Sequence, residues 1–198
     1  MVSIKPSNAI LRYVGNGIFM KGVPVGQDDT FRFDCLRCGK CCEHPPGVNP
    51  EEASRMAQYM QISRTDFFNR YLTLIPDDSY GWKVKVDKIG DNCALYSKEN
   101  GKASCKVNPV KPRQCRAKPV SRMGSKITAE GVVPDLMFEP CRGFGRGKEY
   151  TVGEWISVQK LNESWAEELD YFHKIETLKL TTPASKLKER IAELFLSE

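Results

Sequence analysis

The sequence predicts a small α+β fold with a loop-rich core that contains its cysteines. Short apolar stretches interrupted by glycine and proline indicate strands, and runs with apolar residues three and four positions apart indicate helices. Eight cysteines lie in or beside turn-rich segments. A chain of 198 residues has the length of one domain, so we expect a single domain over 1–198, with a cysteine-cluster core over 31–147 and C-terminal helices over 151–198.

The N-terminal half is expected to begin with strands and to continue with two helices. Residues 1–34 contain short apolar stretches between glycines and end in the alternation Phe31-x-Phe33. Asn49 is a suitable N-cap for a helix that has Pro50 at its first position. A second helix is expected after Ser63. The apolar stripes of the two helices are Ala53, Met56, Ala57 and Met60, then Phe67, Phe68, Tyr71 and Leu72.

A strand, a hairpin and further helices are expected in the second half. Residues 80–86 alternate between apolar and polar types, and residues 100–101 (Asn-Gly) predict a hairpin turn with Cys93 and Cys105 on its two arms. Thr151 has capping-box spacing and precedes one long amphipathic helix. Pro183 begins a last helix. The apolar positions of these two helices are Trp155, Val158, Leu161, Trp165, Leu169 and Phe172, then Leu187, Ile191, Leu194 and Phe195.

The cysteines are the candidate metal ligands. A thiolate is a soft anionic ligand, and two cysteines spaced CxxC can both face one metal. Disulfides fit less well because the N-terminus lacks the apolar run and cleavage site of a secretory signal. A dithiol redox pair would need only two cysteines, and one or two thiols could be small buried apolar groups. The eight candidates are Cys35, Cys38, Cys41, Cys42, Cys93, Cys105, Cys115 and Cys141.

The spacing favours an iron–sulfur centre of the 4Fe-4S type, with zinc as the alternative. Sites rich in cysteine and without histidine suit zinc, iron–sulfur clusters or copper(I). Cys35-x-x-Cys38-x-x-Cys41 repeats the spacing with which bacterial ferredoxins hold three corners of a cluster. Adjacent side chains such as those of Cys41 and Cys42 point to opposite sides of an extended backbone. The eight thiols therefore allow two four-thiolate centres, or one centre with spare cysteines.

The charge pattern suits an anionic centre better than a nucleic-acid surface. The formal net charge is +5, and nine basic residues against Glu99 alone lie between Lys98 and Lys126. Such cations stabilise a thiolate cluster, and few aromatic residues are interleaved for stacking on bases. Arg113 and Arg116 are candidates to donate hydrogen bonds to cluster sulfurs. No apolar run approaches the roughly 20 residues of a membrane span, so we expect a soluble, cytoplasmic protein.

Groups that could transfer protons in catalysis are few. His44 follows Cys42 closely and could ligate or tune a centre, although a solvated loop histidine is the preferred interpretation, and His173 is interpreted as a helix surface residue. The glycines of Gly143-x-Gly145-x-Gly147 lack the strand-to-helix context of a phosphate-binding loop, so we interpret them as a turn. The sequence leaves open whether a centre here relays electrons or catalyses a reaction.

Five segments of the chain together resemble the YkgJ-type cysteine-cluster family, which is described as zinc- or iron-chelating. The resemblance covers about residues 31–147 and departs from the family pattern at Lys118 and Arg142, neither of which is a ligand position. It implies a metal or iron–sulfur centre. A related cysteine cluster occurs in flagellin lysine N-methylases, so the resemblance also allows a methylase-like enzyme. The segments begin at Cys35, Cys93, Cys105, Lys111 and Cys141.

We therefore expect a metal-binding protein with an accessory or electron-transfer role and a redox or client protein as partner. The alternatives are a structural zinc-binding interaction module and a cluster-dependent enzyme.

Overall fold

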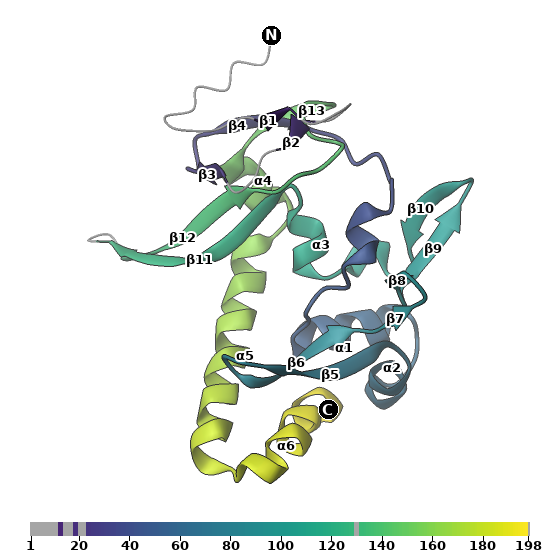
Figure 1. Cartoon of the computed structure of the whole chain (residues 1–198), viewed down its shortest axis with the longest axis vertical. Helices are drawn as coiled ribbons and strands as arrows, with labels where there is room; N and C mark the ends of the chain where they lie inside the picture. Colours follow the sequence, from purple (N-terminus) through teal and green to yellow (C-terminus); the bar gives the residue numbers. More distant parts are fainter. Residues whose placement is uncertain (1–11, 14–17, 20–22, 129–130, 198) are drawn as a thin grey trace. The chain divides into compact units, whose positions relative to one another are not determined.

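The computed structural model describes residues 12–13, 18–19, 23–128 and 131–197 (Figure 1). They form six α-helices and several short antiparallel strand pairs, which confirms the predicted α+β class. Of the strands expected in the first 34 residues, the described ones are β1 (Arg12–Tyr13), β2 (Ile18–Phe19), β3 (Val23–Val25) and β4 (Thr30–Phe33); the rest of that prediction lies outside the described residues. None of the described helices is both long and apolar enough to cross a bilayer.

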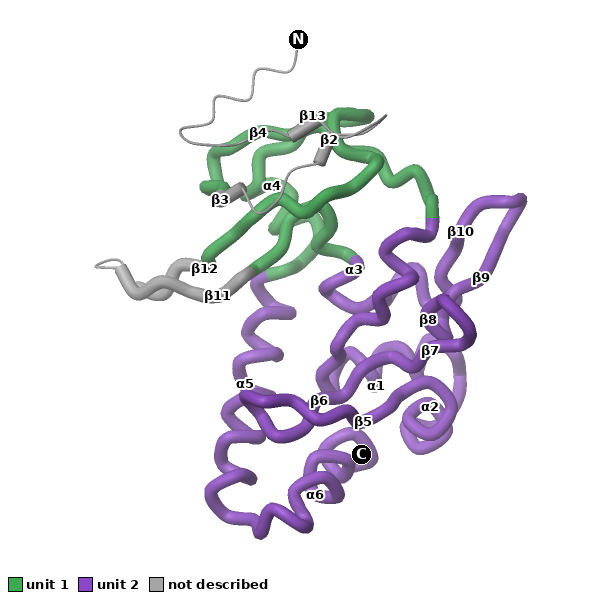
Figure 2. Tube along the Cα trace, viewed as in Figure 1, with its two compact units in different colours: residues 1–38, 116–161 green, residues 39–115, 162–198 purple. Residues whose placement is uncertain are grey.

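The chain divides into two compact units (Figure 2). Unit 1 consists of Met1–Cys38 and Arg116–Leu161, and unit 2 of Gly39–Cys115 and Asn162–Glu198. The chain first passes from unit 1 to unit 2 between Cys38 and Gly39, within the first group of cysteines. The domain boundaries expected from the sequence stay predictions.

The first two helices of unit 2 begin where their caps predict. In α1 (Pro50–Tyr59), the side chain of Asn49 accepts a hydrogen bond from the N–H of Glu52 at 2.8 Å, and the Glu52 carboxylate accepts one from the N–H of Asn49. This reciprocal pair is a complete capping box. Ser63 is the N-cap of α2 (Arg64–Tyr71), because its side chain accepts a hydrogen bond from the N–H of Asp66.

One hydrophobic core holds unit 2 together. β5 (Leu72–Asp77) and β6 (Gly81–Val86) form an antiparallel hairpin, and the buried residues of β6, Val84 and Val86, follow the alternating pattern predicted for residues 80–86. Most of α5 (Leu161–Thr181) and all of α6 (Ala184–Leu196) belong to this unit. Fully buried core side chains include Met56, Phe67, Val84, Val86, Leu95, Val107, Ile175, Ile191 and Phe195.

The predicted hairpin at Asn100 and Gly101 is present, and one of its cysteines lies elsewhere than expected. β9 (Tyr96–Glu99) and β10 (Lys102–Cys105) are joined by these two residues, both with positive φ, as the tight turns of hairpins require. Cys105 ends the second arm opposite Tyr96. Cys93 is in β8 (Asn92–Cys93), which pairs with β7 (Lys88–Ile89) and precedes the hairpin, so its placement on the first arm was wrong.

The described part of unit 1 contains the β1–β2 pair, two further small sheets and the short helix α4 (Val152–Val158). β11 (Val120–Thr128), β12 (Gly131–Phe138) and β3 form an antiparallel sheet in the order β11-β12-β3, and β13 (Lys148–Thr151) pairs with β4. The ring of Phe31 lies 5.2 Å from that of Phe138 and 5.9 Å from that of Trp155, between centroids. The indole N–H of Trp155, in α4, donates to the carbonyl of Ala117 at 2.8 Å.

The long helix predicted from Trp155 onward is two helices. Thr151 caps α4 with a complete capping box, as its spacing predicts. The helix ends at Val158, and Lys160 has a φ of 50°, a left-handed conformation that interrupts helical hydrogen bonding before α5 begins at Leu161. Because of this break, Val158 does not join the apolar stripe of the following helix and is 63% exposed.

Candidate metal centre

Cys41 and Cys42 lie in a short 3-10 turn, η1 (Lys40–Glu43), at the start of unit 2. Gly39 precedes the turn with a φ of 80°, and its carbonyl accepts a hydrogen bond from the N–H of Cys42 at 2.9 Å. A Cβ atom at Gly39 would lie 3.3 Å from the Cβ of Ala103. The turn therefore packs closely against the β9–β10 hairpin, whose second arm ends at Cys105.

The segment that follows this turn contacts the helix that carries Cys115. The N–H of Gly47 donates to the side-chain oxygen of Gln114 at 3.2 Å, and the N–H of Val48 donates to the carbonyl of Val84 at 3.1 Å. Gln114 directly precedes Cys115 in α3 (Arg113–Ala117). Residues 39–48 thus lie against both the β9–β10 hairpin and α3.

Hydrogen bonds join the segments that directly follow Cys93 and Cys105. The N–H of Lys106 donates to the carbonyl of Leu95 at 2.8 Å, and its ammonium donates to the carbonyl of Ala94 at 3.1 Å. Both cysteines are half-buried against the core of unit 2. From there the chain passes through η2 (Asn108–Val110) into α3 and reaches Cys115.

The pKa values of four of these five thiols are raised, with neighbouring thiol charges among the causes. The hydrogen bond to Cys41, burial and neighbouring thiolate charges all raise the pKa of Cys42 far above its ordinary value. Burial raises the pKa of Cys115 to about 12, and the charges of Cys41, Cys105 and Cys93 act in the same direction. Burial also raises the pKa values of Cys93 and Cys105, with a further contribution from Cys41. The group resists ionisation unless a cation compensates its charge, and a bound metal supplies that charge.

The thiols do not form a preassembled metal site. Within the described ranges, no three His, Cys, Asp or Glu side chains are gathered as the ligands of one ion would be. Binding would therefore require the thiols to move closer together than they lie in this structure. The donor set itself fits the group, because soft thiolates select zinc, copper(I) and iron–sulfur clusters.

The other three cysteines, Cys35, Cys38 and Cys141, belong to unit 1. A bridge between Phe33 and Phe144 sets the register of the loop that carries Cys141 against the end of β4. The N–H of Asp34 donates to the carbonyl of Gly143 at 3.2 Å. This antiparallel arrangement places Cys35, one residue after Asp34, beside the backbone near Cys141.

The glycines after Cys141 permit a close approach of two backbones. A Cβ atom at Gly143 would overlap the carbonyl oxygen of Asp34, and one at Gly147 would lie 2.6 Å from the Cβ of Asp34. Side chains are excluded at both positions for this reason. The interpretation of the glycines as a turn after a candidate ligand agrees with this geometry, and the turn is packed against β4.

The two candidate arginines have protein partners. The guanidinium of Arg113 is buried, lies 3.5 Å from the carboxylate of Glu52 and forms an ion pair with Glu168. The guanidinium of Arg116 donates to the carbonyl of Gln159 at 2.6 Å. Their proposed hydrogen bonds to cluster sulfurs stay predictions. His44 and His173 are exposed, in agreement with their interpretation as surface residues.

Two residues that position the candidate ligands were missed by sequence reasoning. Glu52, in the first turn of α1, accepts a hydrogen bond from the N–H of Arg113 at 2.6 Å and is 2% exposed. It thereby fixes the start of the helix that carries Cys115. Gln114, whose side-chain oxygen accepts a hydrogen bond from the N–H of Gly47, has no sequence pattern that predicts this role. A second hydrogen-bond partner for Glu52 could have been suspected from its capping-box position, because its carboxylate has more lone pairs than the cap uses.

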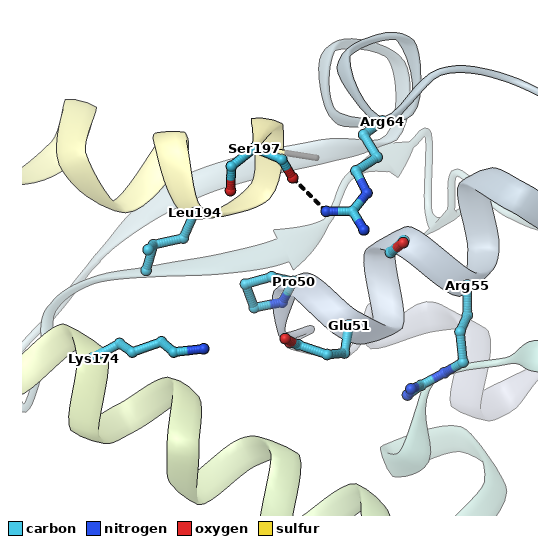
Figure 3. A pocket seen from close by; sticks show the side chains of 8 residues that line it. Pro50, Glu51, Arg55, Arg64, Lys174, Leu194 and Ser197 are labelled. Carbon is cyan, nitrogen blue, oxygen red and sulfur yellow. Dashed lines mark hydrogen bonds between the residues drawn. The ribbon is translucent and has the colours of Figure 1, made fainter.

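Unit 2 also contains a cavity of about 460 Å³ with no cysteine in its lining (Figure 3). Three basic residues line it, and each has a partner in the protein. Arg55 forms two hydrogen bonds with Glu167, Lys174 pairs with Asp170 at 2.7 Å, and Arg64 donates to the carbonyl of Ser197. The cavity therefore supplies no cationic group that lacks a counterpart and is not assigned a ligand.

Fold and thiol arrangement together define a cysteine-rich α+β domain suited to chelating a soft metal. Residues 34–136, just over half of the chain, match the CxxCxxCC family, described as "Putative zinc- or iron-chelating domain". The chain belongs to this family. Comparisons with curated proteins and with solved structures found no match.

Proposed function

We propose that the protein binds an iron–sulfur centre of the 4Fe-4S type through its cysteines and acts as an accessory or electron-transfer protein for a partner protein. The observation that supports the proposal is that five cysteines, from η1, β8, β10 and α3, belong to unit 2, where residues 39–48 contact both the β9–β10 hairpin and α3. Membership of a zinc- or iron-chelating family supports metal binding itself.

The spacing of the first cysteine group supports iron–sulfur over zinc. Cys35, Cys38 and Cys41 are spaced as in bacterial ferredoxins, although Cys41 belongs to the other unit. Division of such a run between two centres has a precedent, because the fourth cysteine of the ferredoxin run ligates the second cluster in two-cluster proteins. Eight thiols are enough for two four-thiolate centres.

A structural zinc module is the second candidate, because the family description and the thiol chemistry accommodate zinc equally well. In this case the centre would stabilise unit 2, where each of four short segments contributes a thiol. The two candidates differ in the bound element and in the colour of the protein.

Metal analysis of protein purified without oxygen separates these candidates. We expect iron and acid-labile sulfide in equal amounts, with broad visible absorption from sulfur-to-iron charge transfer. Zinc without sulfide, in a colourless protein, would favour the structural module. A full chain that retains neither element, even after incubation with iron and sulfide or with zinc, would contradict the metal-binding proposal.

A further inference from the structure

The helix that carries Cys115 is too short to fix its own position. α3 has five residues, which is little more than one turn. Isolated helices below about 12 residues are marginal in water, because few internal hydrogen bonds offset the cost of ordering the backbone. The position of Cys115 therefore depends on the contacts that α3 makes with neighbouring segments.

The side chain of Arg113, at the first position of α3, makes such contacts. It is 7% exposed and lies between two carboxylates of unit 2. Its guanidinium is 3.5 Å from the carboxylate of Glu52 in α1 and forms an ion pair with Glu168 in α5. Glu52 also accepts from the backbone N–H of Arg113, so that link does not depend on the guanidinium. The link to Glu168 in the ion pair does.

A buried charge that loses a partner does not stay where it was. In the protein interior an unpaired ion keeps its desolvation penalty, so it moves toward water or toward another partner. Arg113 is the first residue of α3, and such a movement would displace the start of the helix. Cys115 follows two residues later, so its thiol would move relative to the other cysteines of unit 2.

α5 lies outside the segment that matches the family. The match covers residues 34–136, which include α1 and α3 and end before α5 begins. Glu167, the neighbour of Glu168, also contacts α1, because Arg55 donates to it at 2.6 and 2.8 Å. Two consecutive acids of α5 thus contact two segments of the matched region. Of these two contacts, the one made by Glu168 reaches a helix that carries a cysteine.

We propose that Glu168 is a positioning residue for the metal centre: through Arg113 it fixes the start of α3 and with it the candidate ligand Cys115. The inference rests on the proposed metal-binding function, and it extends the site to a helix beyond the residues that match the family. Glu168 acts through Arg113 and does not contact the metal itself.

The two neighbouring acids provide a matched pair of variants. Glu168→Gln and Glu167→Gln make the same chemical change in the same helix, and each removes the charge from one contact within unit 2. Ile191→Val, in the fully buried core of this unit, lowers stability without changing an ionic group.

Zinc is the probe, because it binds thiolates without added sulfide. Each full chain is freed of metal under reducing conditions and loaded with zinc, and the release of zinc to an excess of a coloured chelator is timed. If the wild type takes up only iron with sulfide, the decay of its visible absorption in the chelator gives the same rates.

We expect Glu168→Gln to release zinc about tenfold faster than the wild type, in the range typical for loss of a residue that orients a metal ligand. Glu167→Gln and Ile191→Val should stay within about threefold of the wild type. Urea unfolding of the metal-free proteins gives the stability of each variant for comparison. An unchanged rate in Glu168→Gln would overturn the proposal. Equal acceleration in either control would do the same, because any loss of stability would then suffice.

A double variant tests whether Glu168 acts through Arg113. Arg113→Met removes the guanidinium and keeps the backbone N–H that binds Glu52. Adding Glu168→Gln to Arg113→Met should change the release rate by less than about twofold, because the partner of Glu168 is already gone. Multiplied effects of the two substitutions would show that Glu168 acts by another route and would contradict the proposal.

The double variant also keeps the test decisive if Glu168→Gln alone does not fold. Replacement of both members of a buried ion pair by uncharged residues is tolerated better than loss of one member. The folded double variant should release zinc about tenfold faster than the wild type, and release at the wild-type rate would contradict the proposal.

Failure of this inference differs from failure of the proposed function. If the wild-type chain holds metal and the variants of Glu168 release it at the wild-type rate, the role of Glu168 is wrong and metal binding stands. If the wild-type chain takes up neither zinc nor iron with sulfide, the proposed function itself fails.

Discussion

At the scale of single residues, the candidate site depends on groups that are not ligands. Glu52 connects the N-terminus of α1 with the start of α3, because its carboxylate accepts from the backbone of Asn49 and from the backbone of Arg113. Cys115 follows two residues after Arg113. The position of this thiol is thus set by a buried acid more than sixty residues earlier in the chain.

We predict that Glu52→Gln lowers the free energy of unfolding by about 1–3 kcal/mol, since the change removes a charged acceptor from a buried network. The guanidinium of Arg113 keeps Glu168 as its partner, which limits the loss. Urea unfolding followed by circular dichroism measures the effect. The neighbouring Glu51→Gln is the control, with an expected change below about 0.5 kcal/mol; equal effects of the two substitutions would contradict the role given to Glu52.

The thiols also make the stability of the metal-free protein depend on pH. Burial raises the pKa of Cys115 from 9.0 to about 12, so the folded state holds this proton more tightly than the unfolded state does. The resulting stabilisation is present below pH 9 and declines as the pH rises from 9 through 12.

We therefore predict that the stability difference between wild type and Cys115→Ala shrinks above pH 9. Urea unfolding with a chelator and a reductant present, from pH 7 upward, measures it. Groups that titrate in both proteins, such as lysines, contribute equally to the two free energies of unfolding, so their contributions cancel in the difference. A difference that stays constant with pH would show that this thiol is not perturbed as described.

At the scale of elements, the cysteines lie on short strands, turns, loops and the short helix α3. In unit 1, the loop of residues 141–147 lies against β4 because Gly143 and Gly147 have no side chains. Gly145 and Gly147 both have a positive φ, of 80° and 72°, but a Cβ atom added at Gly145 would meet no other atom within 4 Å. These two kinds of glycine allow backbone conformation to be separated from close packing.

Gly145→Ala should cost about 1 kcal/mol, the penalty for a left-handed conformation, and Gly147→Ala should cost at least about 2 kcal/mol. The additional loss arises because an alanine Cβ at Gly147 would lie 2.6 Å from the Cβ of Asp34. Chemical denaturation of both variants measures the difference. If Gly145→Ala is as costly as Gly147→Ala, the glycines serve conformation alone and not the approach of the loop to β4.

At the scale of the whole molecule, local signals predicted the elements and could not predict which cysteines share a compact unit. Caps at Asn49, Ser63 and Thr151 act within a few residues, so the starts of three helices were correctly predicted. The break at Lys160 was missed because the apolar pattern continues across it, and its left-handed backbone has no glycine to announce it.

The candidate site was predicted as a set of residue types and not as an arrangement. All eight cysteines could be named from their chemistry and spacing. The run from Cys35 to Cys42 gave no indication that the chain passes from one compact unit to the other after Cys38. Contacts between segments far apart in sequence, such as Gly47 with Gln114, determine that division. Such contacts depend on the packed fold.

The central claim is that sulfur atoms from separate segments of this chain bind a metal, and X-ray absorption at the metal edge tests it most directly. We predict a first coordination shell made of sulfur alone, at about 2.3 Å for iron or zinc bound by thiolates. For a 4Fe-4S centre, a second shell of iron would accompany it. A first shell dominated by nitrogen or oxygen would contradict the claim, because the metal would then be held by other residues or by solvent.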